Sequence, residues 1–586
     1  MIANPFKRPR KSRRSRPAAR TAIRPCAPGT TDERVQAALE VSYARLLMTG
    51  AMLLFAFGAI GVRLVDISLL QAAREPQSAL APRMQELRMD RADVIDRNGV
   101  LLATNLATAS LFANPRKVMN PDETARQLAA ALPELREAEV ARQLKSNRSF
   151  VWLRRNLTPR QQWRVIELGL PGIDFQSAES RVYPNGSLAA HILGFADIDN
   201  RGIAGIEKTF DATLRDSADP LRLTVDMRVQ HILRSALMRA KTEFSALGAT
   251  GIVLDARNGE VVAMTSLPDF DPNDGGNAGD NQKFNRATLG VYELGSTFKI
   301  FTAAMALDYG IVTMRDGYDA TKPIKISRFT IRDYHAKRRW LSVPEIFMYS
   351  SNIGSAKMAE AVGSEAQREF LGRIGMLRPA SIELPEVGSP MMPSPWRPVN
   401  TMTISYGHGL AVSPLQLASG VAAMVNGGVF HKPTLIRREN AEAPQGKRII
   451  SAKTSREVRR LMRLVVENGT GRRASAEGYI VGGKTGTADK PKRGGYSRRA
   501  LISSFVGAFP MTDPRYVVLV TLDEPRGNKS THGYATGGWV AAPVVKRIIE
   551  RAAPLLRVHP TDEQSPAVKK ELYIAFKREG RQLASF

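Results

Sequence analysis

The chain of 586 residues has one cysteine, Cys26, and seven histidines. Because Cys26 has no second cysteine to pair with, the chain can form no internal disulfide and no metal site built from several cysteines. The histidines are scattered, and none stands four residues from another, as two metal ligands on one face of a helix would. We therefore expect neither a metal nor any other cofactor.

Acidic residues are few for a chain with so many bases. There are 56 Asp and Glu against 84 Lys and Arg, so the formal net charge is +28. Residues 1–45 hold eleven of the bases and three of the acids, a charge of +8, and their proline, arginine and serine content predicts a disordered tail. Such a tail suits nucleic acid or anionic lipid. Because no DNA-reading motif accompanies it, we expect no nucleic-acid partner.

One long uncharged run follows the tail, and it covers the 17 residues 46–62. This length is at the short end for a membrane-spanning helix, although the long side chains of Arg45 and Arg63 can reach the water interface from its ends. A cleaved signal peptide is disfavoured because no small-residue cleavage site follows, and a buried core helix is the other alternative. We expect an uncleaved membrane anchor over 46–68, with the tail in the cytoplasm and the chain beyond about residue 70 outside.

Three short motifs stand in a fixed order in the second half of the chain. They are Ser296-Thr297-Phe298-Lys299, Ser350-Ser351-Asn352 and Lys484-Thr485-Gly486-Thr487, with 54 and then 134 residues between their first members. Each motif alone is weak, since Ser-x-x-Lys occurs by chance in a chain of this length. The ordered set resembles the signature of penicillin-recognising serine enzymes, which attack acyl-D-alanyl-D-alanine peptides through a serine ester.

The first motif suits an activated serine. The apolar run that follows Ser296 predicts a buried helix, and residues three apart share one face of a helix. Lys299 can therefore reach the Ser296 hydroxyl, and a neutral amine there would be the base that a serine nucleophile needs. Burial and a neighbouring cation both lower a lysine pKa. Lys484 of the third motif is the candidate cation.

The third motif admits two interpretations. Residues 478–485 match the Gly-x-x-x-x-Gly-Lys-Thr loop that binds phosphates, but that loop must lead into a helix. The residues after Thr485 include Pro491 and a glycine pair, which predict a turn instead. We therefore favour a strand over 479–487 that lines a cleft. Within it, the residues that would hold a substrate carboxylate or let it approach are Lys484, Thr485 and Gly486.

Segments outside these motifs resemble class B penicillin-binding proteins over roughly residues 85–550. The segments that carry the resemblance are Arg91 to Ala103, Arg181 to Gly186 with Ala190-His191 and Gly194-Phe195, Gly205 to Asp211, Leu223 to Gln230, and Asn285 to Ser296. The resemblance implies an α+β fold: an N-terminal transmembrane helix, a mixed pedestal domain, and a β-lactamase-like transpeptidase domain whose antiparallel sheet is flanked by helices. It also implies a single-pass protein of the cell inner membrane with a periplasmic catalytic domain.

On this basis the chain divides into five parts. They are a cytoplasmic tail at 1–45, the anchor at 46–68, a pedestal or dimerisation-like domain at 71–220, the transpeptidase domain at 221–554 and a peripheral tail at 555–586. Within the pedestal we expect helices near 122–145 and 159–168. Within the transpeptidase domain we expect a hairpin at 251–264, a central strand at 516–522 and a closing helix at 540–551.

Details of four segments resemble the division-specific branch of class B more than the elongation branch. They are Ser350 to Gly354, Ser405 to Leu410 with Pro414 to Ala418, Asp523 to Pro525, and Gly537 to Pro543. The elongation branch more often has Cys-Asp in the second motif. The resemblance therefore implies a peptidoglycan D,D-transpeptidase of the division septum, with a septal glycosyltransferase and other division proteins as partners.

The resemblance also assigns roles to the motif residues. Ser296 would attack the carbonyl between the two terminal D-alanines of a stem peptide, with Lys299 as base, and an amine of a neighbouring stem would take the acyl group. The residues that would relay the proton to the leaving amine and hold the substrate amide are Ser350 and Asn352. The backbone N–H groups of Ser296 and Thr487 would form the oxyanion hole, and Thr485 and Thr487 would bind the carboxylate. β-Lactams would acylate Ser296 and remain there as inhibitors.

Two other classes of function stay open. One is a hydrolase with the same acylation chemistry, a D,D-carboxypeptidase or a β-lactamase, which would need a base for water that does not stand out in the sequence. The other is a non-catalytic division scaffold, against which the complete motif set argues. Among the remaining residues, His191 and His408 are interpreted as structural, the basic stretch at 328–339 as a solvated surface, and Asp333 carries no readable role.

Overall fold

The computed structural model describes residues 47–63, 91–326, 329–438, 445–492 and 495–575. The chain forms two units, residues 1–88 and 89–586, which are described separately. The first contains a helix over residues 47–63. Within the described ranges, no helix combines the length and the apolar character needed to cross a membrane. The predicted tail at 1–45 and the ends of the predicted anchor, 46 and 64–68, lie outside the described residues.

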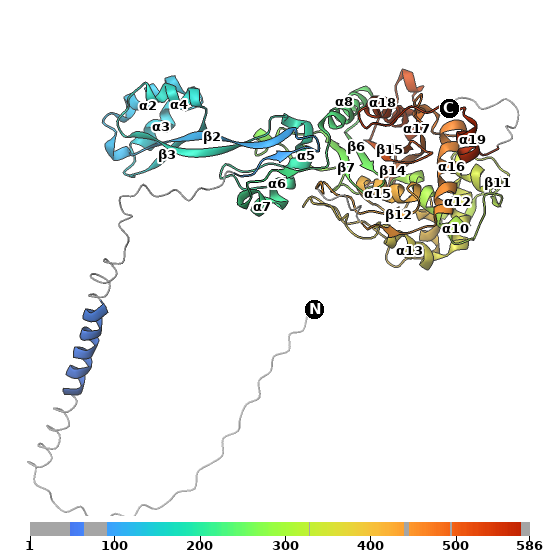
Figure 1. The fold of residues 1–586 in the computed structure, drawn as a ribbon, viewed down its shortest axis with the longest axis horizontal. Helices are drawn as coiled ribbons and strands as arrows, with labels where there is room; N and C mark the ends of the chain where they lie inside the picture. The colour runs from blue at the N-terminus through green and yellow to red at the C-terminus, as the bar shows by residue number, and fades with distance from the viewer. Residues whose placement is uncertain (1–46, 64–90, 327–328, 439–444, 493–494, 576–586) are drawn as a thin grey trace, which may run out of the picture. The chain divides into compact units, whose positions relative to one another are not determined.

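The N-terminal part of the second unit is built on a sheet of five strands in the order β3-β2-β1-β5, with β4 also paired to β2. The strands are β1 (Val94–Ile95), β2 (Leu101–Ala113), β3 (Val151–Leu157), β4 (Ile173–Val182) and β5 (Leu221–Arg222). The long strand β2 runs from the short helices α5–α7 to the helices α2–α4 (Figure 1). These helices are α2 (Pro121–Ala131), α3 (Glu137–Leu144), α4 (Pro159–Ile166), α5 (Ala190–Leu193), α6 (Gly205–Thr209) and α7 (Asp211–Asp216).

The helix predicted near 122–145 is two helices. α2 ends at Ala131, and α3 starts at Glu137 after a break that contains Pro133, which a continuing helix would not tolerate. The prediction of a helix near 159–168 is confirmed by α4, whose N-cap Thr158 forms a capping box with Gln161. Leu128, Val140 and Val165 from the three helices are buried in one small core.

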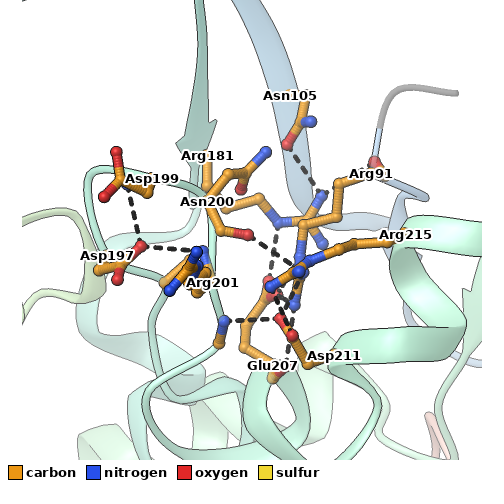
Figure 2. Close-up of polar contacts among 12 residues, drawn as sticks. Arg91, Asn105, Arg181, Asp197, Asp199, Asn200, Arg201, Glu207, Asp211 and Arg215 are labelled. Atoms are coloured by element: carbon orange, nitrogen blue, oxygen red, sulfur yellow. Dashed lines mark hydrogen bonds and ion pairs between the residues drawn. The ribbon is translucent and has the colours of Figure 1, made fainter. Parts of the chain in front are cut away.

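Arg91 and Arg181, one from each of the first two family-like segments, meet at a single carboxylate (Figure 2). The Nε atoms of both arginines donate to Glu207 at 2.7 Å, and Arg91 also donates to Asp211 at 2.8 Å. Glu207 is fully buried, so the two guanidinium groups compensate a charge that has no access to water. This ion cluster ties the start of β1 and the end of β4 to helices α6 and α7.

The C-terminal part is built on a second five-stranded sheet, antiparallel throughout, in the order β14-β15-β16-β6-β7. Its strands are β6 (Gly248–Asp255), β7 (Val261–Leu267), β14 (Gly482–Lys492), β15 (Gly495–Phe509) and β16 (Tyr516–Asp523). The predicted hairpin at 251–264 is confirmed by β6 and β7, and the predicted central strand by β16, which lies third of five.

Helices cover both faces of this sheet. α8 (Met227–Glu243), α17 (Gly537–Val540) and α18 (Ala542–Ala552) share one hydrophobic core with the sheet. α10 (Lys299–Asp308), α15 (Pro414–Val425) and α16 (Ala452–Asn468) belong to a second core, which includes β6 and β16 residues of the other face. The expected α+β domain with a helix-flanked antiparallel sheet is thus confirmed, and α18 is the closing helix predicted at 540–551.

Smaller elements complete the domain. They are α9 (Asp280–Lys283), the 3₁₀ turn η5 (Gly295–Phe298), β8 (Gly317–Asp319), β9 (Ile324–Ile326), β10 (Phe329–Ile331), β11 (Trp340–Ser342), α11 (Val343–Met348), α12 (Asn352–Val362), α13 (Ser364–Arg373), α14 (Pro398–Ile404), β12 (Val429–Phe430), β13 (Lys447–Arg448) and α19 (Pro566–Leu572). The chain after 555 was predicted to be peripheral. In its described part, α19 instead packs on α16 and buries Val568 and Leu572.

The turn predicted after Thr485 is wrong. β14 continues to Lys492 and pairs with β15, so that Pro491 lies opposite Tyr496. Proline is tolerated there because β14 is the edge strand of the sheet and one of its sides has no strand to receive an N–H. A phosphate-binding loop would need a helix directly after it. Lys484-Thr485 instead lies within a strand that continues to Lys492, which favours the strand interpretation.

Candidate active site

Ser296 lies in a 3₁₀ turn, and Lys299 is the first residue of the α-helix α10. The turn is held in place by its neighbours: the Thr297 hydroxyl donates to the Leu294 carbonyl at 2.9 Å. Gly295 adopts φ +57°, and a Cβ atom there would lie 2.7 Å from the Thr487 carbonyl oxygen. Only glycine therefore fits, and its absent side chain lets the serine turn lie directly against β14.

The second motif occupies the junction of α11 and α12. Ser350 has φ +60°, a left-handed conformation that is rare for a residue other than glycine and that local structure must hold. Ser351 is the N-cap of α12, and its hydroxyl accepts the backbone N–H of Gly354 at 3.0 Å. Asn352 is the first residue of the helix.

The lysine of the first motif connects the serines to the asparagine. Lys299 Nζ lies 2.7 Å from Ser296 Oγ, 2.7 Å from Asn352 Oδ1 and 3.2 Å from Ser350 Oγ. A neutral amine has two N–H groups and one lone pair. These three contacts satisfy such an amine fully when it donates to Asn352 and Ser350 and accepts the hydroxyl proton of Ser296, which is the arrangement a general base requires.

The surroundings favour that neutral form. Lys299 is buried, and burial, reinforced by the nearby charge of Lys484, holds its pKa well below the usual range, while Asp333 acts in the opposite direction. Burial also lowers the pKa of Lys484 to about 7. Lys484 Nζ donates to Ser350 Oγ at 2.9 Å, so both lysines contact one hydroxyl.

The third motif lies on the edge strand β14 beside the serine turn. The Thr485 hydroxyl is 2.8 Å from the Thr470 hydroxyl, and the Thr487 hydroxyl accepts the backbone N–H of Gly537 at 3.0 Å. Gly486 is closely packed, because a Cβ there would come within 2.3 Å of Ser504 Oγ and 2.5 Å of the Leu294 carbonyl oxygen. We predicted that Gly486 makes room for substrate. That role stays a prediction, and the structure adds a second reason for glycine here, the close approach of β14 to the segment that carries Ser296.

Comparison with known proteins identifies the family of this chain. A family model described as the penicillin-binding protein transpeptidase domain matches residues 249–550, and one described as the penicillin-binding protein dimerisation domain matches residues 87–236. A probable peptidoglycan D,D-transpeptidase FtsI of Caulobacter vibrioides is 42% identical over 482 residues, which cover 80% of this chain and 82% of that protein. The chain belongs to the penicillin-binding transpeptidase family.

One further relative and one solved structure are also similar. A probable peptidoglycan D,D-transpeptidase PenA of Neisseria meningitidis is 36% identical over 523 residues, which cover 83% of this transpeptidase and 88% of that protein. A crystal structure of penicillin binding protein 3 from Mycobacterium tuberculosis, complexed with aztreonam, superposes with a TM-score of 0.65 at 24% identity and covers 81% of this chain and 98% of that one. At that identity the match shows a shared fold.

Asp333 is part of the site, although no motif in the sequence marks it. Its two carboxylate oxygens accept the Ser351 hydroxyl at 2.8 Å and the Ile353 backbone N–H at 2.9 Å. The preceding carbonyl, that of Arg332, accepts the side-chain amide of Asn352 at 3.0 Å. Asp333 stands 18 residues before Ser351, and the only signal was its position at the end of a short run of alternating apolar residues.

The other residues singled out in the sequence lie outside the lysine–serine network. His191 Nε2 is 2.7 Å from the Gln282 carbonyl oxygen, and burial lowers the pKa of this histidine to about 4, as fits the predicted structural role. His408 pairs with Glu293 at 3.2 Å. In the basic stretch, Arg332, Lys337 and Arg338 are exposed, while Arg328 lies outside the described residues. Over the described ranges, no cluster of three or more residues has the composition of a metal site.

Proposed function

We propose that this transpeptidase is the septal peptidoglycan D,D-transpeptidase of its cell and that it cross-links stem peptides through an ester on Ser296. The observation that carries the proposal is the buried amine of Lys299, which lies 2.7 Å from the Ser296 hydroxyl and whose pKa is held far below that of a free lysine. A serine next to a neutral buried base is an activated nucleophile.

In the acylation step, Ser296 Oγ attacks the carbonyl carbon of the penultimate D-alanine while its proton moves to Lys299 Nζ. The C–N bond to the terminal D-alanine then breaks, and the leaving nitrogen takes a proton by way of Ser350, which contacts both lysines. The terminal D-alanine leaves as a free amino acid, and the peptide stays on Ser296 as an ester. The N–H groups of Ser296 and Thr487 are assigned to the carbonyl oxygen, where charge develops.

In the second step the acyl group passes from Ser296 to an acceptor amine. An amine of a neighbouring stem peptide attacks the ester carbonyl and gives its proton to Lys299, the C–O bond to Ser296 breaks, and the proton returns to the serine oxygen. The product is a peptide bond between two stems. Thr485 and Thr487 lie on β14 beside the serine turn, where their hydroxyls suit the substrate carboxylate, and we assign the substrate amide to Asn352. Bound β-lactams would acylate Ser296 in the same way.

The division branch is supported by the relatives and by the second motif. The Caulobacter vibrioides relative carries the name FtsI, as does an Escherichia coli protein that is 28% identical over 527 residues. The last two residues of the second motif are Ser351 and Asn352, whereas the elongation branch more often has Cys-Asp there. We assign the anchor to residues 46–68, the tail to the cytoplasm, and the catalytic domain to the periplasm, where peptidoglycan precursors are. A septal glycosyltransferase and other division proteins are the partners of this proposal.

The test separates a transpeptidase from a carboxypeptidase. Full-length protein in detergent is given a stem pentapeptide or its lipid-linked precursor with and without an acceptor amine, and D-alanine release and cross-linked product are measured by mass spectrometry. The proposal predicts that product forms with the acceptor and that Ser296→Ala abolishes it. Release of D-alanine at the same rate with water alone, and no cross-linked product, would instead assign the site to a hydrolase.

A further inference from the structure

Residues 331–333, which belong to none of the three motifs, contact the second motif and the helix α12 that follows it. We call these three residues the clasp. The Ile331 side chain is buried in a small core with Ala356 of α12 and Met402. The next two residues then make the polar contacts described above, through the Arg332 carbonyl and the Asp333 carboxylate. Three consecutive residues thus hold the start of α12 by one packing contact and three hydrogen bonds.

The contacts of this clasp lead directly to the base. Asn352 donates its side-chain N–H to the Arg332 carbonyl, which fixes the amide orientation and points Oδ1 at Lys299 Nζ, 2.7 Å away. The Ser351 hydroxyl donates to Asp333 and accepts from Gly354, so its geometry is set on both sides. A rotation of the first turn of α12 would move Asn352 Oδ1 away from Lys299 Nζ.

We propose that Asp333 is a positioning residue of the transpeptidase reaction: its carboxylate fixes Ser351 and the first turn of α12 so that Asn352 meets the amine of Lys299. The inference rests on the proposed function, because it deepens the account of the same site. Asp333 touches no reacting atom in this arrangement and acts through Ser351, Ile353 and Asn352.

The carboxylate also has an electrostatic effect that a simple helix cap would lack. The groups that face Lys299 are the cation of Lys484 on β14, the Asp333 carboxylate after β10 and the Tyr406 ring, 5.8 Å from Nζ, after α14. Of the two charged groups, Lys484 lowers the lysine pKa and Asp333 raises it. Acylation requires neutral Lys299, so the acylation rate falls as the pH drops through the pKa of Lys299. This fall is the acidic limb of the pH–rate profile, and loss of the Asp333 carboxylate moves it to lower pH.

The test is the second-order rate of acylation by benzylpenicillin, followed by intact mass from pH 4 to 9 on full-length protein. Asp333→Asn removes the charge and one of the two acceptor oxygens. We expect a rate about 10- to 100-fold lower at the plateau, as for a catalytic group displaced by a fraction of an ångström to one ångström, with the acidic limb shifted to lower pH. Asp333→Glu keeps the charge and should return the limb toward that of the wild type while the rate stays reduced.

The matched control is Asp226→Asn. Asp226 is the N-cap of α8, where it accepts the Arg228 backbone N–H at 3.0 Å, and it is not among the charges that act on Lys299. This variant should lose thermal stability and keep the acylation rate and its pH profile. If Asp333→Asn fails to fold, Ser351→Ala removes the hydroxyl that binds Asp333, and its plateau rate should fall in the same way.

Several results would overturn the inference. Folded Asp333→Asn with the wild-type rate and limb would show that the clasp does not position the site. A slower variant whose limb is unmoved, matched by an equal loss in Asp226→Asn, would reduce Asp333 to an ordinary helix cap. An unchanged rate in folded Ser351→Ala would have the same consequence. Wild-type protein that forms no adduct would overturn the proposed function itself, and the role of Asp333 with it.

Discussion

Lys299 and Lys484 approach the same hydroxyl, that of Ser350, at 3.2 and 2.9 Å. Two protonated amines that contact one buried hydroxyl would repel each other, so the pair is stable when at least one of the two lysines is neutral. Lys299 carries the stronger downward influence, because burial and the charge of Lys484 act on it together. The arrangement therefore assigns the base to Lys299 and leaves the positive charge on the strand side of the cleft.

Replacing Lys299 by methionine removes the base and retains most of the buried volume. We expect the acylation rate by benzylpenicillin to fall about 10²- to 10⁴-fold, the range that a positioned general base contributes, with no loss of thermal stability. Stopped-flow acylation and a thermal melt measure the two effects. Lys357→Met on α12 is the control, since Lys357 is only partly buried and its Nζ donates to the Asp319 carbonyl at 2.8 Å, outside the lysine–serine network. Unchanged acylation in Lys299→Met would refute its assignment as base.

Lys484 makes the stability of the fold depend on pH. Its pKa is about 7 in the folded protein and about 10.4 in an unfolded chain, so between these values the unfolded state binds one more proton. Stability therefore rises with pH across that window, by up to about 1.4 kcal/mol per pH unit from this group, and below pH 7 the contribution no longer changes.

Urea unfolding of the wild type and of Lys484→Met at pH 6, 8 and 10 tests this linkage. The variant lacks the buried amine, so it should be the more stable protein at pH 6, and its advantage should shrink steadily toward pH 10. An advantage that is constant over the three pH values would show that Lys484 does not titrate in the way its burial indicates.

Gly486→Ala tests the close approach of β14 to the serine turn. The added methyl group would meet Ser504 Oγ at 2.3 Å and the Leu294 carbonyl at 2.5 Å, so the strand or the turn must move. Since backbone is one of the obstacles, we expect a loss of stability of about 1–3 kcal/mol and slower acylation. Gly276→Ala is the control because its added methyl group meets nothing within 4 Å. Equal behaviour of the two variants in melts and acylation would contradict the packing argument.

Glu207→Gln tests the ion cluster of Figure 2. The change leaves the buried guanidinium of Arg181 without its carboxylate and Arg91 with Asp211 alone, and we expect a loss of about 3–5 kcal/mol in unfolding free energy. The exposed pair of Glu123 and Arg126 is the comparison, and Glu123→Gln should change the unfolding midpoint little. Denaturant titration of both variants decides, and a small effect of Glu207→Gln would count against the cluster as a stabilising element.

The sequence was most informative where chemistry depends on local spacing. Ser296 and Lys299 are three residues apart on one helical turn, and their contact follows from helix geometry alone. The strand order of the sheet could not be predicted in the same way, although the hairpin at 251–264 and the strand at 516–522 could. Pro491 misled because proline predicts a turn unless the strand is known to be an edge strand, which is a property of the assembled sheet.

Asp333 shows why part of the site stayed hidden. Its contacts with Ser351 and Ile353 join residues 18 and 20 apart across an intervening strand and helix, and no periodicity marks such a pair. The C-terminal segment was missed for a related reason: Val568 and Leu572 are isolated apolar residues in a charged sequence, and only their packing on α16 makes them part of a core. The boundaries drawn at 220 and 554 stay predictions.

The most direct measurement is the intact mass of the full-length protein after brief incubation with benzylpenicillin, beside the Ser296→Ala variant. With Ser296 as the nucleophile, the wild type should gain the mass of one opened β-lactam, the adduct should persist for many minutes, and the variant should gain nothing. Peptide mapping should place the adduct on Ser296. A folded wild type that gains no mass, or an adduct that forms equally on Ser296→Ala, would contradict the assignment of this serine as the nucleophile.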